Sequence, residues 1–216
     1  MPENLRSLIV ILVLATFVFS LVARFATATS IDANDFVRRR NLWFAITLVA
    51  FLAYNFWLYL IAVGALLLIA AKHDANKVGL YFFLLFVVPP ISAEITGLGV
   101  IRYFFEIDYL RLLSLTILLP AALILRKHAV AEGTKPSAAD KLLAAYIVLN
   151  FLLRLNVDTF TNTLRHGFLF VLDIVLPYYV ASRSLKDLQS FRDALMSFAV
   201  AGMVLAVVGV FEFSKH

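Results

Sequence analysis

The sequence predicts an all-α, polytopic bundle of transmembrane helices, and three observations lead to that fold class. Of its 216 residues, 62% are apolar and only 15% are charged, whereas soluble domains carry about 25% charged residues. The mean hydropathy is +0.92. The apolar residues also gather into runs, and about 20 such residues suffice to cross the hydrocarbon of a bilayer. Soluble enzymes, disordered chains and fibrous rods are therefore excluded.

The composition also narrows the chemistry that the chain can carry. It contains no cysteine, which excludes disulfides, thiolate metal sites and cysteine nucleophiles. Its four histidines are isolated and lack the spacing of metal ligands, and there is no phosphate-binding loop or dinucleotide fingerprint. We therefore predict no metal and no cofactor. The net charge of +5 is an orientation signal in a membrane protein, so no nucleic-acid partner is expected.

Seven apolar runs follow one another in what we predict to be a single transmembrane domain, residues 1–216. They are Ser7–Ala23, Leu42–Ala71, Val78–Val88, Leu110–Leu125, Leu142–Leu153, Gly167–Ser182 and Ala194–Phe213. Leu42–Ala71 is too long for one upright span, because a helix of that length measures about 45 Å. A break at Tyr54-Asn55-Phe56 would divide it into two short halves, so the prediction is seven or eight spans.

Prolines and small residues mark irregular positions within these runs. Pro89–Pro90 should end one helix, whereas Pro120 and Pro177 lie inside apolar runs and should kink them. Gly202 and Gly209 lie on one side of the last helix, a pattern that predicts close helix packing.

The distribution of basic residues predicts which loops are cytoplasmic. Three loops, Lys72–Lys77, Arg126–Lys141 and Arg183–Arg192, together hold nine Lys and Arg residues, and the alternate loops, Glu94–Arg111 and Arg154–His166, hold four. The positive-inside rule places the first set in the cytoplasm.

The triplet Arg38-Arg39-Arg40 tests the uncertain run that follows it. With one span over Leu42–Ala71 the triplet lies outside, against the rule; with a hairpin it lies inside, but the N-terminus moves outside. An interfacial helix over Asn34–Asn41, with arginines extending to the headgroups, would reduce the first conflict.

The two outward loops contain the candidate binding residues. In Glu94–Arg111, the side chains of Arg102 and Arg111 are candidate ligands of a lipid phosphate in a re-entrant or interfacial loop. The alternative is an aromatic belt with internal Glu–Arg and Asp–Arg pairs, which the sequence favours.

The second outward loop, Arg154–His166, offers two arginines and a carboxylate. Arg154, Asp158 and Arg165 could together bind a pyrophosphate, since guanidinium offers a planar bidentate fork. Equally, Asp158 or Thr159 could cap the start of a helix. Asp173 lies deep in the next apolar run, where an ionisable group indicates either a functional site or a pair with an arginine of a neighbouring helix.

Several segments resemble the O-antigen ligase/polymerase-like membrane proteins, which include the O-glycosylation ligases found beside bacterial exopolysaccharide loci. The resemblance is carried by Phe86-Val-Val-Pro-Pro-Ile91, Ile101–Ser114, Thr161-Asn-Thr-Leu-Arg165 and Leu176–Leu188. It covers most of Lys77–Phe213 and only the N-terminal half of the family.

The resemblance implies a GT-C-like glycosyltransferase of the bacterial inner membrane. Such an enzyme transfers a glycan from undecaprenyl pyrophosphate, on the periplasmic face, to an acceptor lipid, glycan or protein. In that family the essential arginine and histidine lie beyond the helix that here ends at Phe213. We therefore expect the catalytic residues to lie beyond residue 216. We also expect residues 1–216, as an N-terminal fragment, to be inactive by themselves.

Two other functions stay open at this stage. A transporter or flippase for a lipid-linked glycan is favoured by Asp173 near Pro177 and by the Pro89–Pro90 break. A non-catalytic scaffold of an envelope-assembly complex is favoured by the lack of a recognisable catalytic triad or metal site.

Overall fold

The fold is known from a computed structural model, which describes residues 3–88, 92–96, 103–131, 136–214. The chain divides into two compact units, unit 1 (Met1–Ile91 and Ser184–His216) and unit 2 (Ser92–Arg183). Among the described residues, five helical segments are long and apolar enough to cross a membrane: Leu5–Thr29, Phe56–His73, Tyr109–Ala131, Phe160–Ser184 and Leu188–Phe213. The chain is thus a multi-pass membrane protein built as a helical bundle.

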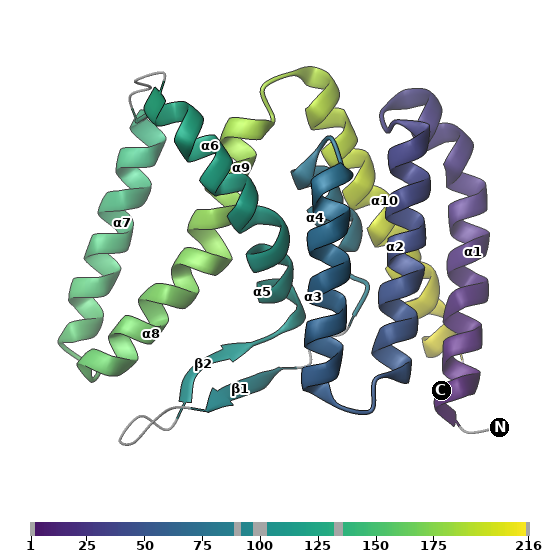
Figure 1. Ribbon diagram of the computed structural model, residues 1–216, viewed down its shortest axis with the longest axis horizontal. Helices are drawn as coiled ribbons and strands as arrows, with labels where there is room; N and C mark the ends of the chain where they lie inside the picture. The colour runs from purple at the N-terminus through teal and green to yellow at the C-terminus, as the bar shows by residue number, and fades with distance from the viewer. Residues whose placement is uncertain (1–2, 89–91, 97–102, 132–135, 215–216) are drawn as a thin grey trace. The chain divides into compact units, whose positions relative to one another are not determined.

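Unit 1 contains five helices (Figure 1). They are α1 (Glu3–Thr29), α2 (Ala33–Leu52), α3 (Phe56–His73), α4 (Lys77–Leu84) and α10 (Leu188–Phe213). The long run Leu42–Ala71 is therefore a hairpin, as one of the two readings of the sequence predicted. The break falls at Ala53–Asn55, where Asn55 caps α3 by accepting a hydrogen bond from the Trp57 backbone N–H at 2.9 Å.

The hairpin places the Arg38–Arg40 triplet within α2, so the interfacial helix over Asn34–Asn41 is wrong. These residues belong to one continuous helix that begins at the cap Asp32. Arg39 does not extend to headgroups but is fully buried. The start of α1 and the loop between α3 and α4 lie at opposite ends of unit 1 (Figure 1), so a cytoplasmic Lys72–Lys77 loop places the N-terminus outside.

An aromatic cluster packs α1, α2 and α4 together. The Phe19 ring stacks on Phe83 with centroids 5.7 Å apart, and it meets Trp43 edge-on at 5.5 Å. Phe36 completes the cluster, with its ring perpendicular to that of Phe83 at 6.0 Å. By contrast, Val13, Phe17 and Leu21 on α1 are exposed. An outward apolar stripe of this kind is what a lipid-facing helix requires.

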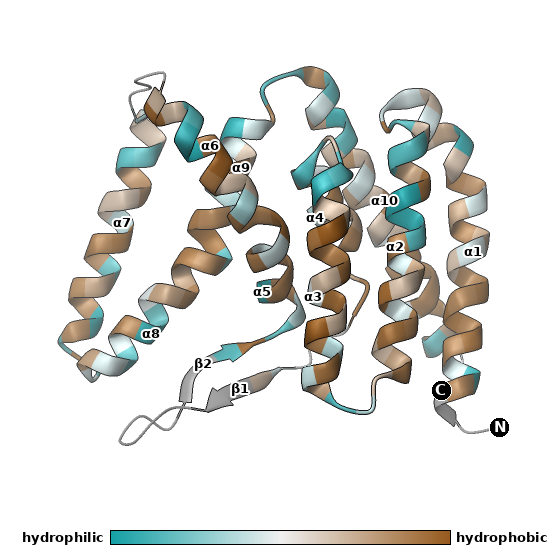
Figure 2. Ribbon diagram, in the orientation of Figure 1, coloured by the Kyte–Doolittle hydropathy of each residue, from teal (hydrophilic) through white to brown (hydrophobic). Residues whose placement is uncertain are grey.

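A buried ionic network joins α2, the α3–α4 loop and α10. Arg39 donates to both carboxylate oxygens of Asp74, from Nε and Nη2, at 2.8 Å each. Its Nη1 donates to Asp193 at 2.6 Å and to the Ser197 hydroxyl at 2.8 Å. Figure 2 shows hydrophilic residues of unit 1 near the starts of α2, α4 and α10, where this network lies. Through these hydrogen bonds, Arg39 of the triplet holds α2, the α3–α4 loop and α10 together.

Unit 2 begins with a short antiparallel hairpin, which the sequence analysis missed. Strands β1 (Ala93–Thr96) and β2 (Tyr103–Ile107) pair with Ala93 opposite Ile107 and Glu94 opposite Glu106. A re-entrant or interfacial loop was the less favoured of the two interpretations of this segment, and strand pairing satisfies those backbone polar groups that face the partner strand. Residues 97–102, which include Arg102, lie outside the described residues, and so does the predicted break at Pro89–Pro90.

The helices of unit 2 contain two π-helical turns, each just before a proline. They are η1 (Ser114–Leu118), between α5 (Tyr109–Leu113) and α6 (Leu119–Ala131), and η2 (Val171–Val175), between α8 (Phe160–Phe170) and α9 (Leu176–Ser184). A proline ring clashes with the carbonyl four residues earlier, and these carbonyls, of Thr116 and Asp173, lie inside the turns. The predicted distortions at Pro120 and Pro177 are thus confirmed as π-turns.

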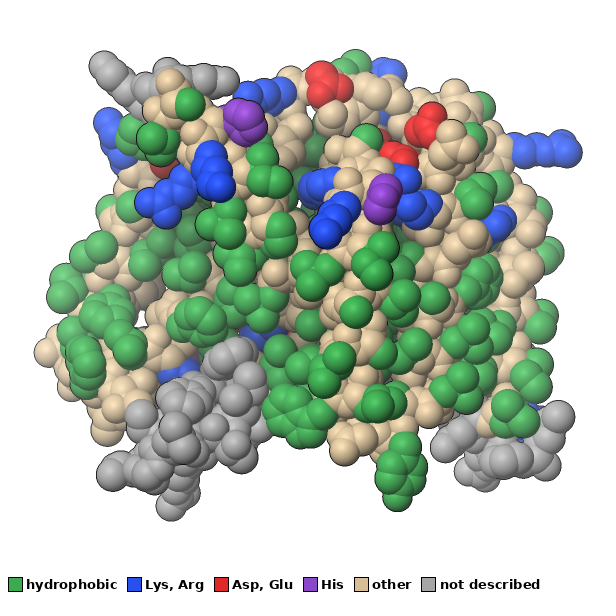
Figure 3. Space-filling view, in the orientation of Figure 1, with side chains coloured by type: hydrophobic (Ala, Val, Ile, Leu, Met, Phe, Trp, Pro, Cys, Tyr) green, Lys and Arg blue, Asp and Glu red, His purple; other side chains and the backbone are tan. Residues whose placement is uncertain are grey.

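The remaining helix of unit 2, α7 (Ala138–Leu155), has no buried residue and packs against α8. Figure 3 shows hydrophobic side chains over the middle of the visible face of each unit, with Lys and Arg gathered toward one end. In unit 1, the expected close packing at Gly202 and Gly209 is wrong, because no described atom lies within 4 Å of a Cβ built at either residue.

Candidate functional site

Unit 2 holds a cleft of about 430 Å³ that is lined by three of the six predicted binding residues. One face of α7 lines it through Ile147, Asn150, Phe151 and Arg154. The facing side of α8 and η2 lines it through a second set with the same helical spacing, Thr163, His166, Gly167, Phe170 and Asp173. Such i, i+3, i+4 and i+7 positions share one helix face. Glu106 of β2 and Arg111 of α5 complete the polar lining.

Arg111 stands among three carboxylates at one end of this lining. Its Nη2 lies 3.3 Å from Asp173, and its Nη1 lies 3.6 Å from Asp108 and 3.9 Å from Glu106. Nη1 also donates to the Glu106 carbonyl at 2.7 Å. The Asp108 carboxylate, in turn, caps α5 by accepting from the Arg111 backbone N–H at 2.8 Å. The predicted pairing of Asp173 with an arginine, and the predicted Glu–Arg and Asp–Arg pairs, are therefore confirmed at Arg111.

Arg154 supplies the positive charge at the other end of the lining, where His166 also lies. Arg154 lies 3.8 Å from Asp158, a long contact for an ion pair. The oxygens of Asp158 are already engaged, because one accepts from the Thr159 backbone N–H at 2.9 Å and the other accepts from the Asn162 side chain. The Asn162 hydrogen bond, with smaller contributions from His166 and Arg154, lowers the pKa of Asp158 below its ordinary value. Arg154 is thus only loosely held and its guanidinium is accessible from the cleft.

The start of α8 explains why Asp158 and Thr159 occur where they do. The Thr159 hydroxyl accepts a hydrogen bond from the Asn162 backbone N–H, which makes Thr159 the N-cap of α8. The capping role that the sequence offered for this pair is confirmed. It also positions Thr163 and His166 on the first turns of the helix that faces α7.

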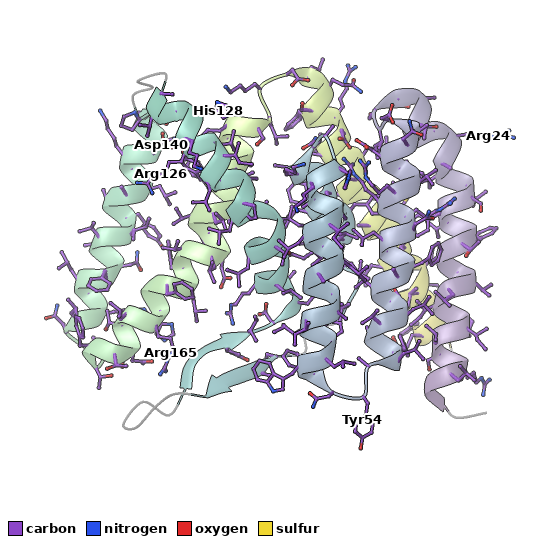
Figure 4. All side chains as sticks on the ribbon, in the orientation of Figure 1. Arg24, Tyr54, Arg126, His128, Asp140 and Arg165 are labelled. Atoms are coloured by element: carbon purple, nitrogen blue, oxygen red, sulfur yellow. The ribbon has the colours of Figure 1, made fainter. Side chains whose placement is uncertain are left out.

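Of the six binding candidates in the sequence, three line the cleft: Arg111, Arg154 and Asp173. Asp158 adjoins it through Arg154. Arg165 is not among the lining residues, and its Nη1 lies 3.2 Å from Asn162. Figure 4 shows Arg165 near the start of α8, whereas Arg126, His128 and Asp140 lie at the opposite end of unit 2. Arg102 lies outside the described residues.

Sequence reasoning missed Asn150, Thr163, His166 and Glu106 as lining residues. The signal was available for three of them, because Asn150 and Arg154 are four residues apart and Thr163, His166 and Asp173 share one helix face. Glu106 gave no such signal, because its place depends on the pairing of β1 with β2.

The π-turn η2 shapes the cleft at Asp173. Pro177 has no backbone N–H, so the Asp173 carbonyl has lost its usual helical partner. One residue earlier, the Leu176 N–H donates to the Val171 carbonyl, five residues back, and not to the Leu172 carbonyl as in an α-helix. Within unit 2, η2 packs against both η1 and α5, which brings the Asp173 carboxylate to Arg111. π-Turns are frequent at functional sites.

The electrostatics of the cleft are those of a balanced polar site. Among the charged lining residues, two carboxylates, Glu106 and Asp173, face two guanidinium groups, Arg111 and Arg154. The rings of Phe151 and Phe170 lie beside them. Charged and amide groups can exchange hydrogen bonds with hydroxyls, and aromatic rings offer an apolar surface. Among the described residues, no group of three or more His, Asp or Glu side chains could hold a metal ion.

Comparisons with protein-family models, with curated proteins and with solved structures find no match for this chain.

Proposed function

We propose that the cleft of unit 2 binds a membrane lipid that carries a glycan on a pyrophosphate. The chain would thereby form the donor-binding half of a GT-C-like glycan ligase or polymerase of the bacterial inner membrane, serving lipopolysaccharide O-antigen, exopolysaccharide or protein O-glycosylation. The observation that carries this proposal is the composition of the cleft, in which a cationic end adjoins a polar and aromatic lining.

The cationic end suits the phosphates. Among the described residues, the Arg154 side chain has one long ionic contact, to an Asp158 whose oxygens are occupied by neutral donors. An anionic ligand can therefore recruit this guanidinium at little cost, because a partly exposed ion pair contributes about 0–1 kcal/mol. His166 lines the cleft beside it and adds a further donor.

The polar and aromatic part suits the sugars. A sugar ring exposes hydroxyls that donate and accept hydrogen bonds, and an apolar C–H face. Asn150 and the Arg111–Asp173 pair supply donors and acceptors, and Phe151 and Phe170 supply ring faces. The resemblance to O-antigen ligases also implies a glycan donor that is carried on a lipid pyrophosphate.

Ligand binding to the chain in lipid nanodiscs tests the proposal. The probe is a polyprenyl pyrophosphate that carries one N-acetylglucosamine. Arg154→Ala should weaken its binding about 10- to 100-fold, because a hydrogen bond to a charged group is worth about 1.5–3 kcal/mol. Arg165→Ala is the matched control, since Arg165 belongs to the same region but does not line the cleft. Equal affinities for the two variants would refute the assignment.

Transport of the same lipid is the second candidate function, and a separate observation favours it. Asp173 lies in a π-turn beside Pro177, inside the candidate span Phe160–Ser184, and broken helices with polar groups are typical of transporters. Proteoliposomes with the labelled lipid in one leaflet distinguish the two functions. Movement of the label between leaflets without an acceptor would favour transport, and retention in one leaflet would favour the donor site.

A further inference from the structure

Two buried polar atoms of the cleft residues have no hydrogen-bond partner. They are the Thr163 hydroxyl oxygen and the Arg111 Nε, and among the described residues only two other buried side-chain atoms share this property. Thr163 is fully buried, with 0% of its surface exposed. Buried polar atoms without partners are rare in native proteins and call for an explanation.

The hydrogen bonding of the Thr163 hydroxyl differs from that of five other helical threonines. Thr16, Thr27, Thr29, Thr47 and Thr116 each donate their hydroxyl to the backbone carbonyl four residues earlier, at 2.6–3.0 Å. For Thr163 that carbonyl belongs to Thr159, and it accepts the Thr163 backbone N–H at 2.9 Å but not the hydroxyl. Helical threonine populates two rotamers for this reason, and the hydroxyl of Thr163, a residue that lines the cleft, has no partner among the described residues.

The charges around Arg111 decide what kind of oxygen these two donors can bind. Three carboxylates already lie within 4 Å of its Nη atoms. A phosphate at Nε would therefore meet net negative charge and be repelled. A neutral oxygen meets no such repulsion, and each of the two groups, the Arg111 Nε–H and the Thr163 hydroxyl, can donate to such an oxygen.

Gly167 lines the cleft one helical turn beyond Thr163, and it adjoins the Phe151 ring. A Cβ built at Gly167 would lie 3.6 Å from that ring, in ordinary van der Waals contact. The missing side chain therefore adds room of about one methyl group to the cleft beside Phe151.

We propose that Thr163 Oγ1 and Arg111 Nε bind neutral hydroxyl or carbonyl oxygens of the sugar that adjoins the pyrophosphate. Arg111 then binds the sugar and not the phosphate, and the ligand lies with its phosphates toward Arg154 and His166. This inference rests on the proposed function, and it adds a residue that determines specificity, Thr163, and a direction of binding.

Substitution of Thr163 tests the inference with two probes, the polyprenyl pyrophosphate with and without its N-acetylglucosamine. The chain in nanodiscs should bind the sugar-bearing probe at least about tenfold more tightly, since sites that donate to a ligand oxygen discriminate against analogues that lack it. Thr163→Val should abolish this preference but keep the affinity for the sugar-free probe. Thr163→Ser should retain it, because the hydroxyl is restored.

A stability measurement distinguishes a binding role from a structural one. Because the hydroxyl has no partner in the unbound chain, Thr163→Val should leave the thermal midpoint unchanged or raised. Thr161→Val, at an exposed threonine of the same helix outside the cleft lining, is the control and should change neither quantity.

The possible failures are distinct. If neither probe binds, the proposed function fails. If the two probes bind the unchanged chain equally well, or if Thr163→Val keeps the preference, then this inference fails while the proposed lipid pyrophosphate site stands.

Discussion

Replacing Arg39 by methionine should strongly destabilise unit 1. The side chain of Arg39 is fully buried, and it donates to both oxygens of Asp74 and both oxygens of Asp193. Arg39→Met fills much of the same volume but leaves two buried carboxylates without their common partner. Removing one side of a buried ion pair costs about 3–5 kcal/mol. Since two carboxylates are stranded, we expect the upper part of this range.

Unfolding by sodium dodecyl sulfate in mixed micelles, followed by far-UV circular dichroism, measures this difference. Arg40→Met is the matched control, because Arg40 is the next residue and its side chain contacts only the Asn41 side chain, at 3.2 and 3.4 Å, among its described hydrogen bonds. Its effect should stay within about 0.5 kcal/mol. A triple variant, Arg39→Met with Asp74→Asn and Asp193→Asn, should recover part of the loss, since it strands no charge. The reasoning is refuted if Arg39→Met and Arg40→Met unfold at the same detergent fraction.

Three further changes have defined outcomes. Gly79→Ala should cost about 1–3 kcal/mol of unfolding free energy, because its Cβ would lie 3.0 Å from Arg39 Nη1. The control, Gly202→Ala, places its Cβ in open space and should not lower the unfolding free energy. A similar loss in both variants would contradict the argument. Asp140 accepts from the Ser137 backbone N–H and from Arg183, each at 2.9 Å, and these bonds, that of Ser137 first, lower the pKa of Asp140 to about 2. A carboxylate with a lowered pKa stabilises the fold above its unfolded pKa of about 3.9 and loses this effect as the pH falls through about 2. Asp140→Asn should therefore cost about 1 kcal/mol at pH 7, and its unfolding midpoint should converge with that of the unchanged chain between pH 4 and pH 2; a constant gap would exclude Asp140 as the titrating group. Pro177→Ala should permit a regular helix at Asp173 and turn its carboxylate away from Arg111, so nanodisc binding of the sugar-bearing lipid pyrophosphate should weaken while thermal stability is kept; unchanged affinity would show that the π-turn does not shape the site.

Local patterns predicted the helical class and part of the spans. The apolar runs predicted seven or eight spans, whereas five candidate spans occur among the described residues, and the runs Val78–Val88 and Leu142–Leu153 are not among them. The break near Tyr54–Phe56 followed from the length of the run, and Asn55 caps the helix that begins there. Pro120 and Pro177 predicted distortions, since the missing N–H and the ring clash are properties of the residue itself. The capping role of Asp158 and Thr159 likewise depends only on residues within one turn.

Half of the candidate site followed from the same reasoning. Arg111, Arg154 and Asp173 were predicted from residue type and from their place beside apolar runs, and they line one cleft. Thr163 and Glu106 were not, because a threonine on a helix and a glutamate in a loop are ordinary by themselves. Thr163 matters because its buried hydroxyl has no partner among the described residues, and Glu106 because the pairing of β1 with β2 brings it to the cleft.

The sequence by itself determined that this is a multi-pass helical membrane protein, because the hydrophobic cost of exposing such runs to water depends on composition and length alone. Only the tertiary structure decided which charges meet. Arg38, Arg39 and Arg40 are identical in type and adjacent in the chain, yet only Arg39 is fully buried, between Asp74 and Asp193. The positions of these partners, 35 and 154 residues away, depend on how the helices pack, and no local pattern contains that information.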